Sequence, residues 1–169
     1  MSTAPNHVPI SAAGFEHPVD DAQSTFRSAM RALAEPGTLH RIDRAPVPPG
    51  LLSPVTAALL LALADYETPI WLDQTGRDEP GLADFLRFQT GAPIVADPAR
   101  AGFGVITDPS RFAGLDAFAQ GTLEYPDRST TLIVQVERLE PGGRYCLSGP
   151  GIPGERRLGI VPAVPGLAE

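Results

Sequence analysis

The first periodic pattern in the chain predicts an amphipathic helix. Apolar residues recur mostly at three- and four-residue intervals, which is the spacing of one helical face. Asp20 and Asp21 offer a cap and negative charge at the beginning of this helix, and Pro36–Gly37 end it. The apolar positions are Ala22, Phe26, Ala29, Met30 and Leu33, with Arg27 and Arg31 on another face.

A second helix is predicted over Val55–Ala64, where every residue except Thr56 is apolar. Ser53–Pro54 supplies an N-cap followed by proline at the first helical position. Because this helix is apolar all round, we expect it to be covered on most sides. The run is too short to span a bilayer, so the sequence predicts no membrane helix.

Short helices and strands alternate along the rest of the chain. A third helix is predicted over Glu79–Gln89, capped by Asp78, and a weaker one over residues 111–119. After Gly149 the chain is rich in glycine and proline and predicts no regular element. The predicted strands are Thr38–Ile42, Thr68–Asp73, Ala92–Val95, Gly102–Thr107 and Thr130–Val136, and Arg144–Ser148 is expected to pair with the last of these.

This alternation favours an α/β domain with a mixed sheet. A chain of 169 residues is enough for one such domain. We place it at residues 19–158, after a loose N-terminal arm at 1–18 and before a Pro/Gly-rich tail at 159–169.

Composition excludes several classes of function. The formal net charge is −7, and no basic cluster of the kind that binds nucleic acid is present in the sequence. All 13 basic residues are arginine, so neither a lysine Schiff base nor a P-loop lysine can form. The single cysteine, Cys146, excludes an internal disulfide, which fits a cytoplasmic protein. Cys146 lies in an apolar strand signal and is expected to be a small buried residue.

The stretch "LSGPGIPGERR", Leu147–Arg157, has two interpretations. It is either a tight loop at the exit of a strand or a phosphate loop assisted by Arg156 and Arg157. It matches neither glycine-rich phosphate motif, and its prolines remove amide donors. No metal site is predicted, because His7, His17 and His40 lack metal spacing; Asp65 and Asp73 are either caps or partial magnesium ligands.

Six polar residues within otherwise apolar stretches are candidates for a cleft or a partner surface. The alternative for each is a cap or a local salt bridge, as an i,i+4 pair between Arg31 and Glu35 would be. No catalytic residue is assigned. The candidates are Arg27, Glu35, Asp65, Thr68, Arg87 and Thr90.

Several stretches in this order resemble the PhnH family, a subunit of the bacterial carbon–phosphorus lyase system. They are "FRSAMRALAEPG", "ALLLALADYETPIWL", "LRFQTGAP", "TTLIVQV" and "LSGPGI", which together span about Asp20 to Ile152. The resemblance implies a part in joining a phosphonate to the ribose of ATP with loss of adenine, which gives a ribose 1-phosphonate 5-triphosphate. It also implies that the chain works with PhnG, PhnI, PhnJ and PhnL subunits and does not catalyse alone.

The family fold is a three-layer α-β-α domain, similar to the large domain of PLP-dependent transferases but without PLP or another cofactor. Family members are typically homodimers. They usually continue past the Gly-Pro-Gly-Ile loop into a further strand pair, whereas this sequence ends at Glu169, so we expect an unpaired sheet edge. Two other functions remain open: a standalone nucleotide- or phosphate-binding enzyme that uses the glycine-rich loop and arginines, and an interaction domain outside phosphonate metabolism.

Overall fold

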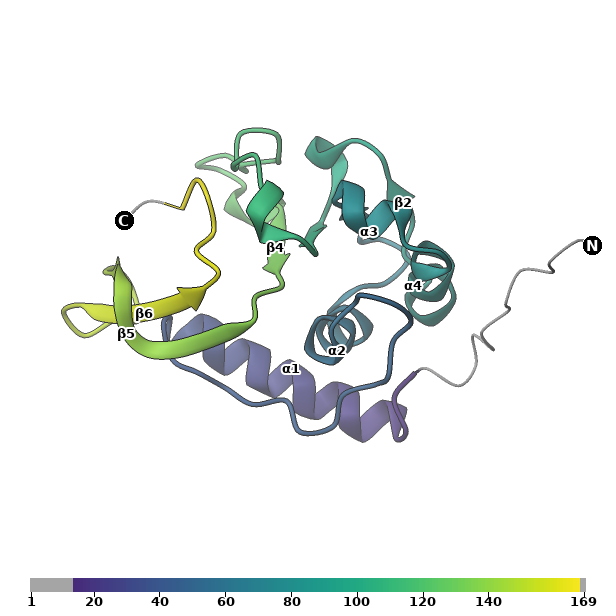
Figure 1. The fold of residues 1–169 in the computed structure, drawn as a ribbon, viewed down its shortest axis with the longest axis horizontal. Coiled ribbons are helices and arrows are strands. Elements are labelled where there is room, and N and C mark those ends of the chain that lie inside the picture. The colour runs from purple at the N-terminus through teal and green to yellow at the C-terminus, as the bar shows by residue number, and fades with distance from the viewer. Residues whose placement is uncertain (1–13, 168–169) are drawn as a thin grey trace, which may run out of the picture.

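A four-stranded sheet organises the domain (Figure 1). The computed structural model describes residues 14–167. Neighbouring strands run parallel in the order β2-β1-β3-β4, so the α/β class is confirmed while the predicted mixed sheet is wrong. The strands are β1 (Ile70–Leu72), β2 (Ile94–Val95), β3 (Phe103–Ile106) and β4 (Thr131–Val134).

The helices begin and end close to the local signals that predict them. Helix α1 spans Pro18–Ala34 and α2 spans Pro54–Leu63, where the Ser53 side chain accepts a hydrogen bond from the Thr56 amide. The third helix, predicted over Glu79–Gln89, corresponds to α4 (Leu82–Thr90), and the short helix α3 (Gln74–Asp78) before it was not predicted. Short 3₁₀ turns cover Pro98–Arg100, Pro109–Arg111 and Pro126–Arg128.

Alternate residues of the central strands face two different cores. On one face, Ile70, Leu72 and Val105 pack with α2 and α4, and α2 lies between α1 and the sheet (Figure 1). On the other face, Trp71 and Ile106 pack against Phe112, Phe118 and Val164. The apolar run of α2 is therefore a core helix, as predicted, with Ala57, Ala58 and Leu60 fully buried.

Helix α1 buries a different face from the apolar one. Its most buried residues are Asp21 and Thr25, whereas Phe26 is 46% and Leu33 67% exposed. The buried face of α1 continues from Asp21 and Thr25 through Ser28, Ala29 and Ala32. These side chains are small, which allows α2 to approach closely.

The last two strands form a separate antiparallel pair beside the end of α1 (Figure 1). Strand β5 (Arg138–Leu147) pairs with β6 (Arg156–Val161), so the predicted pairing of Arg144–Ser148 with Thr130–Val136 is wrong. That pairing would need a turn at "LEPGG", Leu139–Gly143, but this stretch lies within β5, with an irregularity in register between Pro141 and Tyr145. The chain beyond Gly149 contains a strand, β6, so the prediction of no regular element there is wrong, and the predicted domain boundary at residue 158 falls inside this strand.

Four local predictions fail for identifiable reasons. Residues 38–42 form no strand, and the Thr38 hydroxyl donates to the Glu35 carbonyl. Residues 112–119 form no helix, because Gly114 adopts a φ of +106°. Asp78 ends α3 and accepts from Gln74 instead of capping the next helix. Cys146 is exposed, and its neighbour Tyr145 is the buried residue of β5.

The predicted N-terminal arm falls mostly on residues 1–13, which lie outside the described residues, and its last residue, Pro18, begins α1. Within residues 14–167, no helix has both the length and the apolar character needed to cross a membrane.

Candidate functional site

The carboxyl ends of β1 and β3 meet where the strand order of the sheet reverses. From β1 the chain continues to β2 on one side, and β3 then pairs with the opposite side of β1. Open α/β sheets bind ligands outside the strand ends at such a point. A cavity of about 270 Å³ lies here, and we call it the carboxyl-edge cavity. Its lining includes Trp71, Arg77, Ile106, Arg111, Phe112 and Phe118.

Asp73 joins the two strand ends beneath this cavity. It follows β1, and one carboxylate oxygen accepts from the Gly76 amide at 2.8 Å and the Thr107 hydroxyl at 2.7 Å. The other accepts from the Thr107 and Asp108 amides at 2.8 and 2.9 Å. Because both oxygens are engaged by donors of the chain, Asp73 acts as a positioning residue, and the cap interpretation holds over the magnesium one.

Each strand end also presents an arginine to the cavity. Arg77 lies in the last turn of α3, which Asp73 caps, and its guanidinium stands 5.5 Å from the centre of the Trp71 ring. Arg111 ends a 3₁₀ turn capped by Asp108, whose carboxylate accepts from the Ser110 amide and hydroxyl. Arg111 is exposed, and its guanidinium has no hydrogen bond or ion pair with any described residue.

Aromatic side chains form the apolar wall of the cavity. Trp71 and Phe118 meet edge to face, with ring centres 5.3 Å apart, and the Trp71 indole donates to the Ala96 carbonyl at 3.2 Å. Phe118 lies directly over Gly104 of β3, where an added Cβ would be 2.9 Å from the Phe118 ring and 2.5 Å from Leu132. Glycine at this strand position therefore makes room for the aromatic wall.

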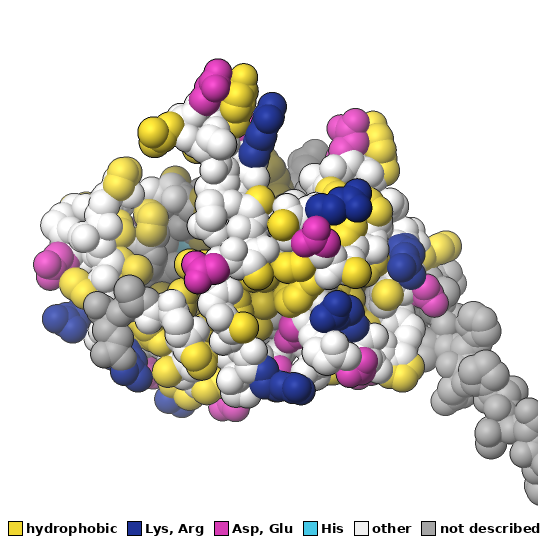
Figure 2. All heavy atoms as spheres, turned by 90° about the horizontal axis from the view of Figure 1, so that it is seen from above, with side chains coloured by type: hydrophobic (Ala, Val, Ile, Leu, Met, Phe, Trp, Pro, Cys, Tyr) yellow, Lys and Arg dark blue, Asp and Glu magenta, His cyan; other side chains and the backbone are white. Residues whose placement is uncertain are grey.

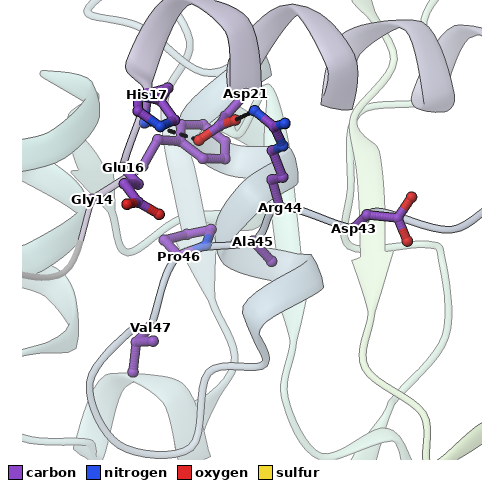
Figure 3. A pocket seen from close by; sticks show the side chains of 10 residues that line it. Gly14, Glu16, His17, Asp21, Asp43, Arg44, Ala45, Pro46 and Val47 are labelled. Atoms are coloured by element: carbon purple, nitrogen blue, oxygen red, sulfur yellow. Dashed lines mark hydrogen bonds and ion pairs between the residues drawn. The ribbon is translucent and has the colours of Figure 1, made fainter.

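A second, larger pocket of about 710 Å³ opens at the start of α1 (Figure 3). Asp21 is only 2% exposed; one oxygen accepts from the His17 amide at 3.0 Å, and the other lies 3.5 Å from Arg44. Asp43 points away from this pair in Figure 3. The contacts tie α1 to the loop at 43–47. Among the described residues, no group of three His, Cys, Asp or Glu side chains could hold a metal ion.

Charged side chains of both signs surround an apolar centre on the face drawn in Figure 2. A surface of this kind lacks the single-sign field that steers nucleic acid to a protein.

The residues predicted from sequence make local contacts. The Thr68 hydroxyl accepts from the Asp65 amide at 2.6 Å and donates back to Asp65, which closes the turn before β1. Arg87 pairs with Asp84 at 3.1 Å. Thr90 donates to the Leu86 carbonyl at 2.7 Å and accepts from the Ala92 amide at 3.0 Å, at the end of α4.

Arg27 is exposed on α1 beside a shallow depression at Ala62, and Glu35 is the C-cap residue of the same helix. None of the six candidates lines the carboxyl-edge cavity. Sequence reasoning missed Arg77 and Arg111. The available signal was an aspartate directly after a buried strand with an arginine three or four positions later, as in "LDQTGR" and "TDPSR".

The glycine-rich loop packs against the end of α1. Arg156 donates to the carbonyls of Glu35 and Pro36 at 3.3 and 2.8 Å, and Arg157 donates to the Gly143 carbonyl at 3.5 Å. The arginines of this loop are thus engaged by backbone carbonyls. The loop connects two antiparallel strands, and this geometry favours the structural interpretation over a phosphate loop.

Comparison with known proteins gives two matches. Residues 13–167 match the model of a family described as bacterial phosphonate metabolism protein (PhnH). The chain is also 39% identical over 160 residues to the alpha-D-ribose 1-methylphosphonate 5-triphosphate synthase subunit PhnH of Rhizobium meliloti (strain 1021). That alignment covers 95% of this chain and 78% of the relative. The resemblance drawn from short stretches of sequence is confirmed, and the chain belongs to the PhnH family.

Proposed function

We propose that this chain is the PhnH-type subunit of an assembly that forms alpha-D-ribose 1-methylphosphonate 5-triphosphate from ATP and methylphosphonate. The observation that carries the proposal is the 39% identity, over 95% of this chain, to a protein that is named as that subunit. The product is an intermediate of phosphonate breakdown, and a separate step of the carbon–phosphorus lyase system then cleaves its carbon–phosphorus bond.

The chain contributes to this reaction by docking and orientation, and it does not turn over ATP alone. Asp73 supports this, because the four hydrogen bonds that it accepts from its own chain engage both carboxylate oxygens in holding two strand ends together. No cofactor belongs to this proposal.

The partners in the proposal are PhnG, PhnI, PhnJ and PhnL subunits and a second copy of this chain, in the cytoplasm. The exposed apolar stripe of α1, with Val19, Phe26, Met30 and Leu33, supports burial of this helix in an assembly. A three-layer arrangement similar to the large domain of PLP-dependent transferases belongs to the same proposal, and superposition of an experimental structure of the chain tests it.

A gene-replacement experiment tests the function. Cells that lack their own PhnH are expected to grow on methylphosphonate as the sole phosphorus source when they carry this chain together with the sibling subunits of its source. A tagged copy is expected to retain those subunits during affinity purification. Failure of growth and of co-purification, with the chain folded and expressed, would contradict the proposal.

Arg87 provides a surface test of the same proposal. Arg87→Ala removes an exposed ion pair with Asp84, which contributes at most about 1 kcal/mol to stability. We expect co-purification and growth to fall while the melting temperature changes by less than about 4 °C. Asp84→Ala is the matched control, because it breaks the same ion pair and leaves the arginine in place. Equal growth and equal co-purification of the two variants would remove Arg87 from the partner surface.

A further inference from the structure

Two neighbouring strand ends deliver the same pair of residue types to one cavity. After β1, Asp73 caps a turn that ends near Arg77; after β3, Asp108 caps a turn that ends at Arg111. Parallel pairing of β1 with β3 brings these turns together, although they are more than thirty residues apart in the chain. The cavity between them is therefore positioned by the pairing of β1 with β3.

The charges of this cavity are not equivalent. Both Asp73 oxygens accept hydrogen bonds, from the Gly76 amide, the Thr107 amide and hydroxyl, and the Asp108 amide. One Asp108 oxygen accepts from the Ser110 amide and hydroxyl. The guanidinium donors of Arg77 and Arg111 make no hydrogen bond or ion pair with any residue from 14 to 167. These two guanidinium groups therefore keep their donors for a ligand, and such donors bind oxyanions with short, charge-assisted hydrogen bonds.

The remaining lining residues and the volume of the cavity limit the chemistry and the size of the rest of the ligand. Ile106, Phe112 and Phe118 are almost fully buried and present carbon to the cavity. The volume of about 270 Å³ lies just below the roughly 300–1,000 Å³ of ordinary small-molecule sites. It can enclose a compact organic group and is too small to enclose a nucleoside triphosphate.

We propose that the carboxyl-edge cavity binds a small organic oxyanion, with its apolar substituent against the aromatic wall and its anionic group held by Arg77 and Arg111. Organic phosphonates and organic phosphates share this chemistry. The site follows from residues of this chain alone and does not rest on the proposed function, so loss of one leaves the other standing.

The only tryptophan of the chain lines this cavity, which gives the site its own optical signal. The full chain is titrated with phenylphosphonate while the Trp71 emission is recorded. Methylphosphonate, phenyl phosphate and inorganic phosphate are then added as competitors, and benzyl alcohol serves as the neutral probe of the apolar wall. We expect saturable binding of phenylphosphonate that weakens as ionic strength rises.

Two arginines in matching turns supply the variant and its control. Arg111 ends "DPSR" and Arg100 ends "DPAR", each in a 3₁₀ turn capped by the aspartate, but Arg100 does not line the cavity. We expect Arg111→Gln to raise the dissociation constant of phenylphosphonate about tenfold, the effect of one lost charge-assisted hydrogen bond, and Arg100→Gln to leave it unchanged. Melting temperatures of both variants confirm that each is folded.

Each remaining outcome decides a part of the proposal. Binding of benzyl alcohol as tight as that of phenylphosphonate, or equal effects of Arg111→Gln and Arg100→Gln, would overturn the anion site. Inorganic phosphate that competes as well as both organic ligands would overturn the role of the apolar wall. Tighter binding of phenyl phosphate than of phenylphosphonate would assign the site to organic phosphates, and the reverse to phosphonates. An absence of saturable binding in the millimolar range would overturn the proposal as a whole.

Discussion

The contact between the glycine-rich loop and α1 can be tested with two alanine substitutions. Gly151 has a φ of +81°, and a Cβ there would lie 2.5 Å from the Ala34 carbonyl oxygen and 3.1 Å from Pro36. Gly154 has a nearly equal φ of +73°, but an added Cβ would meet nothing within 4 Å. The two variants share the backbone strain, and only one of them adds a collision with the helix end.

The magnitudes follow from these two terms. A left-handed conformation costs a residue with a Cβ roughly 1–2 kcal/mol, so Gly154→Ala should lower the free energy of unfolding by about 1 kcal/mol after the entropy gain of alanine is included. Gly151→Ala adds the displacement of a backbone carbonyl that cannot rotate away, for which overpacking values of about 1–3 kcal/mol apply. We expect a loss of about 3 kcal/mol in total.

Thermal and urea unfolding of the purified chain measure both losses. For a domain of this size, about 1 kcal/mol corresponds to roughly 2–4 °C, so Gly154→Ala should lower the melting temperature by roughly 2–4 °C and Gly151→Ala by roughly 6–12 °C. Equal shifts for the two variants would refute the packing of the loop on α1. The structural interpretation of Leu147–Arg157 as a loop packed on α1 would then lose its support.

Two further predictions concern Asp73 and Cys146. Asp73→Asn should lower the free energy of unfolding by about 3 kcal/mol in thermal melts, because an amide cannot accept the four hydrogen bonds that the carboxylate accepts. The control Asp97→Asn affects one cap contact and should lower the free energy of unfolding by less than about 1 kcal/mol. Equal losses for the two variants would contradict the bridging role of Asp73. The Glu155 carboxylate, as hydrogen-bond partner and as negative charge, raises the pKa of Cys146, so alkylation of the native thiol should require a higher pH than alkylation in denaturant. Glu155→Gln should move this pH profile downward, and an unchanged profile would exclude Glu155 as the cause.

The elements that the sequence predicts well are those with local causes. Helix α1 ends at the Pro36–Gly37 stop, and α2 begins at the Ser53 cap followed by Pro54. Both signals act within a few residues, so no knowledge of the rest of the chain is needed. The strands of the parallel sheet are also recognisable, because a strand buried on both faces reads as a continuous apolar run.

Strand partners and buried faces could not be predicted, because they depend on residues far away. The "LEPGG" stretch has the composition of a hairpin turn, yet it lies inside β5, where β6 supplies the pairing partner. The buried face of α1 depends on the close approach of α2, which selects small side chains over the apolar stripe.

The candidate site illustrates the same limit. A capped turn that ends in arginine follows β2 as well as β3, since "DPAR" and "DPSR" are nearly identical. Of the arginines in these two turns, Arg111 lines the carboxyl-edge cavity and Arg100 does not, because β3 adjoins the reversal point of the sheet and β2 is an edge strand. The motif therefore predicts a turn, and the strand order decides which turn reaches a ligand.

The exposed stripe of α1 links the fold to the proposed assembly. Phe26, Met30 and Leu33 keep 46%, 37% and 67% of their surface exposed, an apolar area that an isolated domain leaves in contact with water. Their helical spacing gives one continuous apolar edge, which a partner chain can bury without any change in the domain core. The carboxyl-edge cavity has its own residues, and none of them belongs to α1. Docking through α1 would therefore leave the cavity open, and a subunit built in this way can hold its place in a complex while it binds a small anion.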